Sequence, residues 1–220
     1  MPRPVESPGG QRPAPSNLAG VDAVIAQVSW RPLKGSNSDS RSHRFTLASA
    51  DCARFKVSLV RTALQGLALA LVGLFVVGFT SLAISKHEWS MLFVPLFLLP
   101  VVGGGLYVMY AERAPIVFDL RSGFYIDSRD GARALREGRT DVGLVPLARV
   151  VAVQIVPRSC IQRSNKYTTR YWSYELNLVL DDGARVNVVD HANRRKVRQD
   201  AGKLAAFLGT AFLDDQAREA

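Results

Sequence analysis

Two long runs without a charged side chain constrain the fold of this chain more than any other feature of its sequence. Residues 62–85 and residues 89–111 contain no Asp, Glu, Lys, Arg or His, and only Lys86, His87 and Glu88 separate them. A helix rises about 1.5 Å per residue, so each run forms a helix of about 35 Å, enough to cross a hydrocarbon core of about 30 Å. We therefore predict an antiparallel transmembrane hairpin. A buried hairpin in a soluble protein and a secretory signal peptide fit runs of this length and position poorly.

The distribution of Lys and Arg predicts the orientation of this hairpin. The chain of 220 residues has a net charge of +9, with nine Lys or Arg in residues 1–61, one in the hairpin tip and eighteen in residues 112–220. Positively charged residues accumulate on the cytoplasmic side of a membrane. We therefore expect a multi-pass protein of the bacterial inner membrane, surrounded by lipid, with both termini in the cytoplasm.

Small residues in the two runs predict close helix packing, because they let helix backbones approach each other in lipid. They are Ala63, Gly66, Ala70 and Gly73 in the first run and Gly103, Gly104 and Gly105 in the second. Packing within the hairpin is the favoured interpretation, and self-association or docking of a foreign helix are the alternatives. The absence of ionisable residues from both runs disfavours a transporter or an ion-driven pump.

The residues before the hairpin predict little ordered structure of their own. Residues 1–20 are rich in Pro, Gly and Ser and are expected to form a disordered tail. Residues 21–61 form a cytoplasmic N-terminal segment in this interpretation. An apolar cluster around Trp30 packs on the C-terminal domain or on the membrane. Residues 46–61 form a juxtamembrane helix that continues into the first span.

Residues 112–220 predict a small cytoplasmic α+β domain. Strands are expected at 115–120, 123–127, 150–156, 174–180 and 184–190, with a charged loop at 128–143 and a long loop before Tyr174. Helical spacing over residues 193–208 places Val197, Ala201, Leu204, Ala205 and Leu208 on one face. An antiparallel sheet with a closing C-terminal helix is similar to the pleckstrin-homology-like modules of bacterial membrane proteins.

Groups that could carry chemistry are few and scattered. The histidines are His43, His87 and His191, the cysteines are Cys52 and Cys160, and no pair of them has the spacing of a metal site or of a nucleophile with its base. His191 beside Asp190 could act as a base, although a capping or packing role is more common. We expect no catalytic residue, metal or cofactor, and no nucleic-acid partner, and hence a non-enzymatic protein.

Four basic residues at the start of the last helix form the one unusual charge cluster. Arg194, Arg195, Lys196 and Arg198 lie where the helix dipole is already positive. A nearby anion would relieve this conflict, so these residues are candidates for binding a lipid phosphate or an acidic protein partner. The alternative is a solvated basic surface near an anionic membrane.

The stretch from Tyr174 to Gly209, YELNLVLDDGARVNVVDHANRRKVRQDAGKLAAFLG, resembles the end of a group of small bacterial two-span membrane proteins. Proteins of this kind resemble immunity proteins of type VI secretion systems. The resemblance implies an immunity protein that binds and neutralises a membrane-acting secreted toxin. The alternative function is a membrane-anchored scaffold or a lipid-headgroup-binding module.

Overall fold

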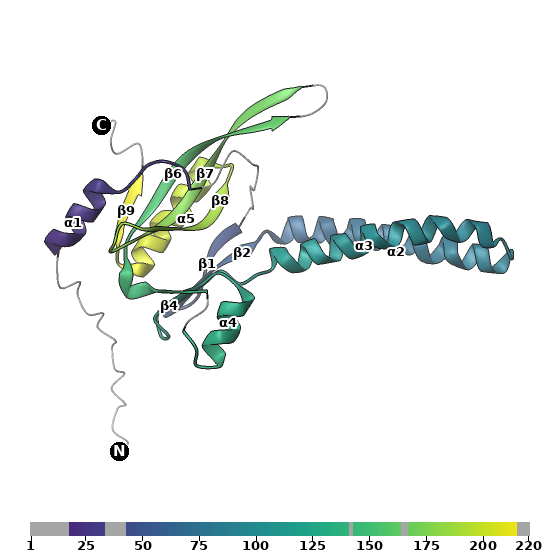
Figure 1. Cartoon of the computed structure of the whole chain (residues 1–220), viewed down its shortest axis with the longest axis horizontal. Coiled ribbons are helices and arrows are strands. Elements are labelled where there is room, and N and C mark those ends of the chain that lie inside the picture. The colour runs from purple at the N-terminus through teal and green to yellow at the C-terminus, as the bar shows by residue number, and fades with distance from the viewer. Residues whose placement is uncertain (1–17, 34–42, 141–142, 164–166, 215–220) are drawn as a thin grey trace, which may run out of the picture.

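The computed structural model describes residues 18–33, 43–140, 143–163 and 167–214, which form a domain and a long projecting helical hairpin (Figure 1). The elements follow in the order α1 (Leu18–Gln27), β1 (His43–Ser49), β2 (Cys52–Val57), α2 (Leu59–Ser85), η1 (Trp89–Leu92), α3 (Phe93–Glu112), β3 (Val117–Asp119), β4 (Phe124–Ile126), α4 (Arg129–Arg136), β5 (Leu144–Pro146), η2 (Leu147–Arg149), β6 (Val150–Arg163), β7 (Thr168–Leu180), β8 (Arg185–His191), α5 (Arg194–Leu208) and β9 (Ala211–Asp214).

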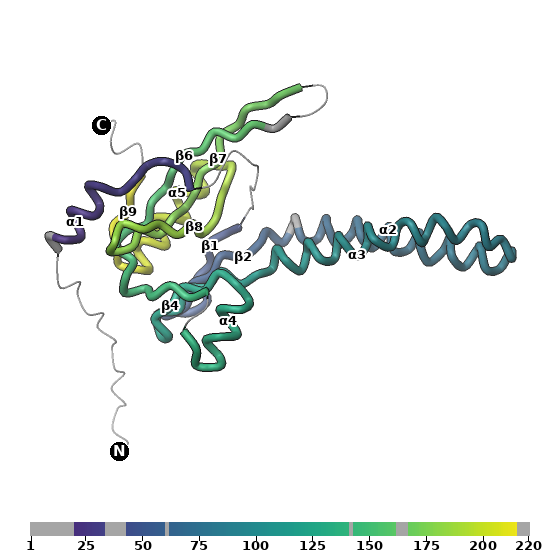
Figure 2. The backbone as a smooth tube through the Cα atoms, in the orientation of Figure 1, coloured from purple at the N-terminus to yellow at the C-terminus, as the bar shows by residue number. Residues whose placement is uncertain are grey.

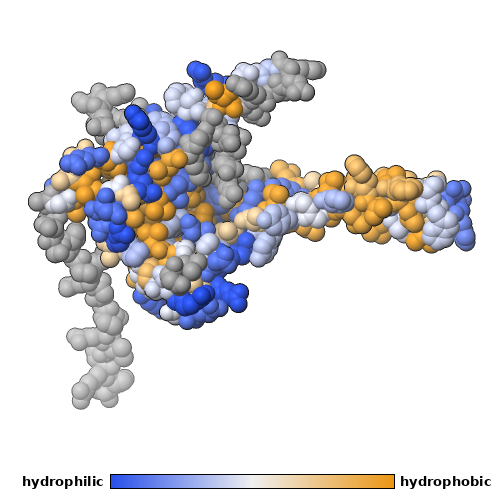
Figure 3. Space-filling model, in the orientation of Figure 1, coloured by the Kyte–Doolittle hydropathy of each residue, from blue (hydrophilic) through white to orange (hydrophobic). Residues whose placement is uncertain are grey.

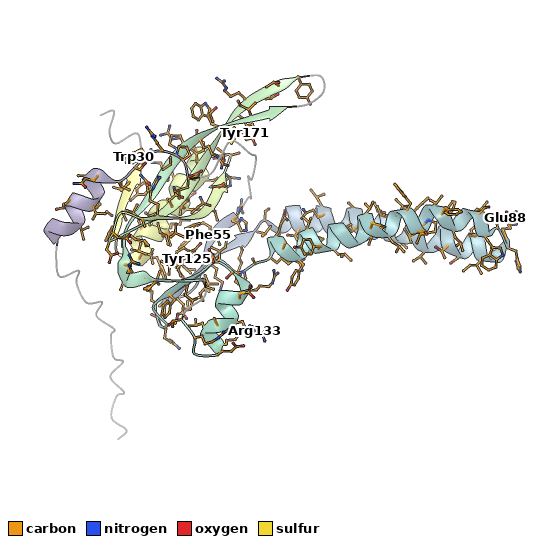
Figure 4. The ribbon with its side chains drawn as sticks, viewed as in Figure 1. Trp30, Phe55, Glu88, Tyr125, Arg133 and Tyr171 are labelled. Carbon is orange, nitrogen blue, oxygen red and sulfur yellow. The ribbon has the colours of Figure 1, made fainter. Side chains whose placement is uncertain are left out.

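Helices α2 and α3 are both long and apolar enough to cross a membrane. Only 6% of the most apolar window of each helix is buried, which distinguishes them from the core helices of a soluble protein. Apolar side chains cover most of the projecting rod, and polar residues gather at its tip around Glu88 (Figures 3 and 4). The predicted helical hairpin is therefore confirmed in its helices and its tight turn.

Residues 43–57 form two strands, so the juxtamembrane helix predicted for residues 46–61 is wrong. In β2, Ala53 and Phe55 are buried while Arg54 and Lys56 are exposed, which is the two-residue alternation of a strand. Strand β2 pairs with β1 on one side and with β3 on the other, where Ala53 lies opposite Phe118. This partner strand follows the hairpin, and α2 begins only at Leu59.

The first sheet therefore joins residues on both sides of the hairpin. Its strand order is β1-β2-β3-β4-β5, and all neighbours are antiparallel. The sequence predicts a domain of residues 112–220 alone, whereas the structure builds it from residues 43–57 as well. The hairpin is an insertion between two adjacent strands, β2 and β3.

The second sheet confirms most of the strand and helix predictions in the C-terminal region. Its order is β8-β7-β6-β9, with β9 parallel to β6 and the other neighbours antiparallel. Helix α5 connects β8 to β9 and buries the five apolar residues that helical spacing placed on one face. Gly209 ends the helix with φ of 57°, a left-handed conformation that glycine adopts without strain.

The main core lies between the two sheets and α5. Phe45, Phe55, Phe118 and Tyr125 form a chain of aromatic contacts, with ring centroids 4.8–6.2 Å apart from one ring to the next. Phe55 and Tyr125, both labelled in Figure 4, are buried in this cluster. Leu204 and other buried residues of α5 complete the same cluster. Since Phe45 and Phe55 precede the hairpin, the core depends on both parts of the chain.

A smaller cluster covers the outer face of the second sheet. Val28 is buried against Ala152 and Val179, with Trp30 packed beside them. The predicted apolar cluster around Trp30 therefore packs on the domain. Leu18, predicted to lie in a disordered tail of residues 1–20, is instead the first residue of α1. Residues 1–17 of that predicted tail lie outside the described residues.

Two segments expected to be loops are regular. Within 128–143, helix α4 forms because Ser128 caps it, accepting a hydrogen bond from the Gly131 backbone N–H at 3.0 Å. The long loop expected before Tyr174 is instead the continuation of β6 and β7. These strands extend past the rest of the sheet as a two-stranded ribbon (Figure 2), with Arg163 paired to Thr168 at its far end.

Candidate functional site

The seam between α2 and α3 uses only some of the predicted small residues. A Cβ atom on Gly105 would lie 2.5 Å from Leu69 Cδ2, so glycine permits the close approach of the two helices there. Gly66 lies on the same seam, where its Cβ would meet Met109 Cε at 4.0 Å. These contacts explain how the hairpin packs against itself.

The other small residues leave space around them. Ala63, Ala70, Gly103 and Gly104 are exposed on the outer surface of the hairpin. Added Cβ atoms at Gly73, Gly103 and Gly104 would meet nothing within 4 Å. The predicted set of small residues is therefore divided between a packed seam and open positions. The open positions present a surface that a further helix could approach closely.

The base of the hairpin is fixed by polar contacts. Gln65 Nε2 donates a hydrogen bond to Glu112 Oε2 at 3.3 Å and so joins the first turns of α2 to the last turn of α3. Arg129 of α4 donates to the carbonyl oxygen of Tyr110, and its guanidinium lies 3.7 Å from the centre of the Tyr110 ring. A cation that bonds a terminal carbonyl complements the helix dipole. Helix α4 is thereby held beside the end of α3, with Arg133 pointing away from the domain (Figure 4).

The basic residues of α5 have a partner within the protein. Arg194 and Arg198 lie 3.6 Å and 3.1 Å from the two carboxylate oxygens of Asp214, whose side chain is 5% exposed. This buried carboxylate is an anion within the protein itself, whereas the basic cluster had predicted one from a lipid or a partner. The sequence does not predict this contact, because Asp214 lies beside the first turns of α5 only once β9 has paired in parallel with β6. Arg195 and Lys196 remain exposed.

An open depression of about 650 Å³ lies beside this ion pair. It is lined by Arg194, Arg195, Arg198, Gln199 and Phe212. Strand β9, which carries Phe212, lies on the side of the domain away from the hairpin (Figure 1). Three arginines in its lining make an anion the ligand that this depression would favour.

A buried polar network on the outer face of the second sheet was not anticipated. Arg158, which is 3% exposed, lies 3.5 Å from Glu175 and 3.6 Å from Asp190. Glu175 also accepts a hydrogen bond of 2.8 Å from the backbone N–H of Leu33. Glu175 lies on the face of β7 opposite to Leu176 and Leu178. The N-terminal segment covers this face, so its polar residues need partners inside the protein.

His191 does not form the base arrangement considered from the sequence. Its Nδ1 accepts a hydrogen bond of 2.8 Å from the Asn193 backbone N–H, whereas the Asp190 side chain contacts Arg158 and Asn187. Successive residues of β8 point to opposite faces, which separates the two side chains. Burial lowers the pKa of His191, and Lys196 adds to this shift.

The remaining candidate groups stay apart. Cys160 is buried, Cys52 is partly buried, and both are free thiols. Among the described residues, no group of three His, Cys, Asp or Glu side chains could hold a metal ion. Comparison with known proteins adds no relative: no family model, curated protein or solved structure matches the chain.

Proposed function

We propose that this chain is a non-enzymatic binding protein of the bacterial inner membrane and that it neutralises a membrane-acting secreted toxin. The observation that carries the proposal is the open surface at Gly103 and Gly104 in the middle of an apolar helix, where no described residue would lie within 4 Å of an added Cβ atom. A toxin that acts within the bilayer exposes helices there, and small residues allow such helices to approach closely.

The orientation in this proposal places both termini in the cytoplasm. It rests on the excess of Lys and Arg outside the hairpin. Lys86, His87 and Glu88 then lie on the periplasmic side, and the domain lies in the cytoplasm.

The architecture of the domain is compatible with the pleckstrin-homology-like layout expected from the sequence, because antiparallel neighbours dominate both sheets and helix α5 follows β8. The chain departs from the simplest form of that layout in two ways. Strand β9 follows α5 and runs parallel to β6, and the hairpin separates β2 from β3.

The alternative function is a membrane-anchored scaffold or lipid-headgroup-binding module. The depression lined by Arg194, Arg195 and Arg198 favours an anionic ligand. Two of these three arginines already contact Asp214, and strand β9, which forms one wall of the depression, lies on the side of the domain away from the hairpin (Figure 1). These features favour a soluble acidic partner over the headgroups of the same membrane.

A competition experiment tests the toxin proposal. Donor cells carrying the co-encoded effector are mixed with recipients that lack this gene or express variants of it. Deletion should sensitise the recipient, and Gly103→Leu should remove protection while membrane insertion stays normal. Val101→Leu, at an exposed position two residues earlier, is the matched control and should protect fully. If deletion sensitises the cell to no co-encoded effector, the toxin proposal is wrong and the scaffold alternative replaces it.

A further inference from the structure

The β6–β7 ribbon extends beyond the support of the rest of the sheet. Strand β8 pairs with β7 only as far as Tyr174, opposite His191, whereas β6 and β7 stay paired to Arg163 and Thr168. Tyr171 lies in this two-stranded part of the ribbon (Figure 4). This part of the ribbon lies outside the core of the domain, so the core does not explain why it carries large apolar side chains.

Three large apolar or aromatic side chains are exposed on this ribbon. Ile161 is 39% exposed, Tyr167 is 65% exposed and Trp172 is 57% exposed. In the register of the ribbon, Ile161 lies opposite Arg170 and Ser159 lies opposite Trp172. Side chains two residues apart on a strand point to the same face, so Ile161, Arg170 and Trp172 share one face. Trp and Tyr combine an apolar body with a polar group, and they concentrate where a membrane meets water.

The charge of the ribbon has a single sign. Residues 142–174 contain no Asp or Glu, and the ribbon and its connecting loop contribute Arg163, Lys166 and Arg170. Arg158 is excluded from this count because it is buried against Glu175 and Asp190. Cations with interleaved aromatic residues complement a surface of anionic headgroups.

The far end of the ribbon lies at the height where the surface of a membrane around the hairpin would lie. Along the long axis of the molecule, the far ends of β6 and β7 lie level with the base of α2 and α3 (Figure 1). If the hairpin crosses a bilayer, the surface of that bilayer lies at its base, because the charged residues Glu112 and Arg113 follow the second span there.

We propose that the end of the β6–β7 ribbon inserts into the headgroup region of the anionic membrane that the hairpin crosses. Trp172, Tyr167 and Ile161 enter the interface, and Arg170 contacts a lipid phosphate. This contact fixes the orientation of the domain on the membrane surface. The inference rests on the proposed membrane location of the hairpin, and it does not depend on the identity of a protein partner.

The test uses the full chain in proteoliposomes and reads the depth of single tryptophans. The chain has three Trp residues, so Trp30→Phe with Trp89→Phe leaves Trp172 as the only reporter. Lipids brominated near the headgroup should quench Trp172 in vesicles with about 30% phosphatidylglycerol, and quenching should weaken in purely zwitterionic vesicles.

Charge variants give the matched comparison. Replacing Arg170 by Gln should lower the ratio of docked to free ribbon by about five-fold at low ionic strength. Salt of about 0.5 M should have a similar effect, because it screens exposed charges. Replacing the exposed Lys203 of α5 by Gln removes the same charge and should leave the quenching unchanged.

Two further measurements separate the possible failures. A variant with Trp89 alone reports insertion of the hairpin, since Trp89 lies beside its tip. Unquenched Trp89 overturns the membrane location itself, whereas quenched Trp89 with unquenched Trp172 overturns only the ribbon proposal. Hydrogen exchange of the unmodified chain should show slower exchange at 161–172 in anionic than in zwitterionic nanodiscs. Equal exchange in the two, or shielding of Trp172 that persists in detergent, assigns the ribbon to a protein contact and overturns the proposal.

Discussion

Gly105 of α3 lies so close to Leu69 of α2 that a Cβ atom on Gly105 would lie 2.5 Å from Leu69 Cδ2. On the neighbouring Gly104, a Cβ atom would meet nothing within 4 Å. Two adjacent glycines therefore have different roles: one brings the two helices together, and the other leaves the outer surface open.

Substitution of these glycines should separate the two roles. Gly105→Ile should destabilise the hairpin by about 1–3 kcal/mol, because the new side chain must displace Leu69 in a packed seam. Gly105→Ala should cost less, since the end of the Leu69 side chain can rotate away. Gly104→Ile is the control and should leave the thermal midpoint nearly unchanged. The measurement is thermal unfolding in detergent, followed by circular dichroism. Equal midpoints for Gly104→Ile and Gly105→Ile would contradict the observed packing.

The buried ion network should be sensitive to loss of its cation. Arg158→Met leaves Glu175 and Asp190 buried without the charge that lies between them. Breaking a buried ion pair in this way costs about 3–5 kcal/mol. Arg149→Met is the matched control, because Arg149 pairs with Asp181 and Asp182 on the exposed surface, where water screens the interaction. Chemical denaturation should show a large loss for the first variant and little change for the second.

Residues 43–57 should be required for folding of the domain. A chain that joins residue 58 to residue 115 through a short Gly-Ser linker should fold without the hairpin, because β2 and β3 are adjacent in the sheet. Residues 112–220 alone should not fold, since they lack Phe45 and Phe55 of the core. Dispersed amide resonances in the linked chain and collapsed resonances in the fragment are the expected spectra. A well-dispersed spectrum from the fragment alone would show that the first two strands are dispensable.

Reporter fusions should establish the orientation. A reporter that is active only in the periplasm should be silent after Ala220 and active when inserted at His87. We expect this pattern because Lys and Arg, which accumulate on the cytoplasmic side of a membrane, lie mostly before and after the hairpin and not at its tip. The reverse pattern would place the domain in the periplasm.

His191 should make the stability of the domain depend on pH. Burial lowers its pKa, so the unfolded state binds a proton more readily than the folded state. The free energy of unfolding should therefore decrease as pH falls below about 6.5, the ordinary pKa of histidine. Protonation would also remove the acceptor that Nδ1 offers to the Asn193 backbone N–H. His191→Gln should reduce this slope relative to the unmodified chain. The same slope in the variant and in the unmodified chain would show that His191 does not contribute it.

The strand prediction failed at residues 46–57 for a clear reason. Phe45, Ala53 and Phe55 have the alternation of strands, but the segment adjoins a long apolar helix and was interpreted as its extension. Its pairing partner, β3, lies beyond the whole hairpin. A pattern in one short segment cannot identify a partner some sixty residues away, so the tertiary pairing decided the secondary structure.

In the candidate site, too, the sequence predicted which residues matter and only the tertiary structure decided their contacts. The small residues and basic residues could be picked from the sequence by their type and spacing. The directions in which they face could not be predicted, because Gly103, Gly104 and Gly105 lie within one helical turn and only their angle about the helix axis separates the packed glycine from the open ones. Asp214 was overlooked because it contacts Arg194 and Arg198 through the fold and not through spacing.

The sequence by itself determined the hairpin and the last helix, since both depend on local patterns. A charge-free run of more than twenty residues and a buried face at helical spacing each specify one element without reference to any other. Only the tertiary structure decided that residues on both sides of the hairpin share one core, and that Arg158, Glu175 and Asp190 meet beneath the N-terminal segment. These contacts join residues far apart in the chain, and their free energy comes from burial that exists only when the whole domain has folded.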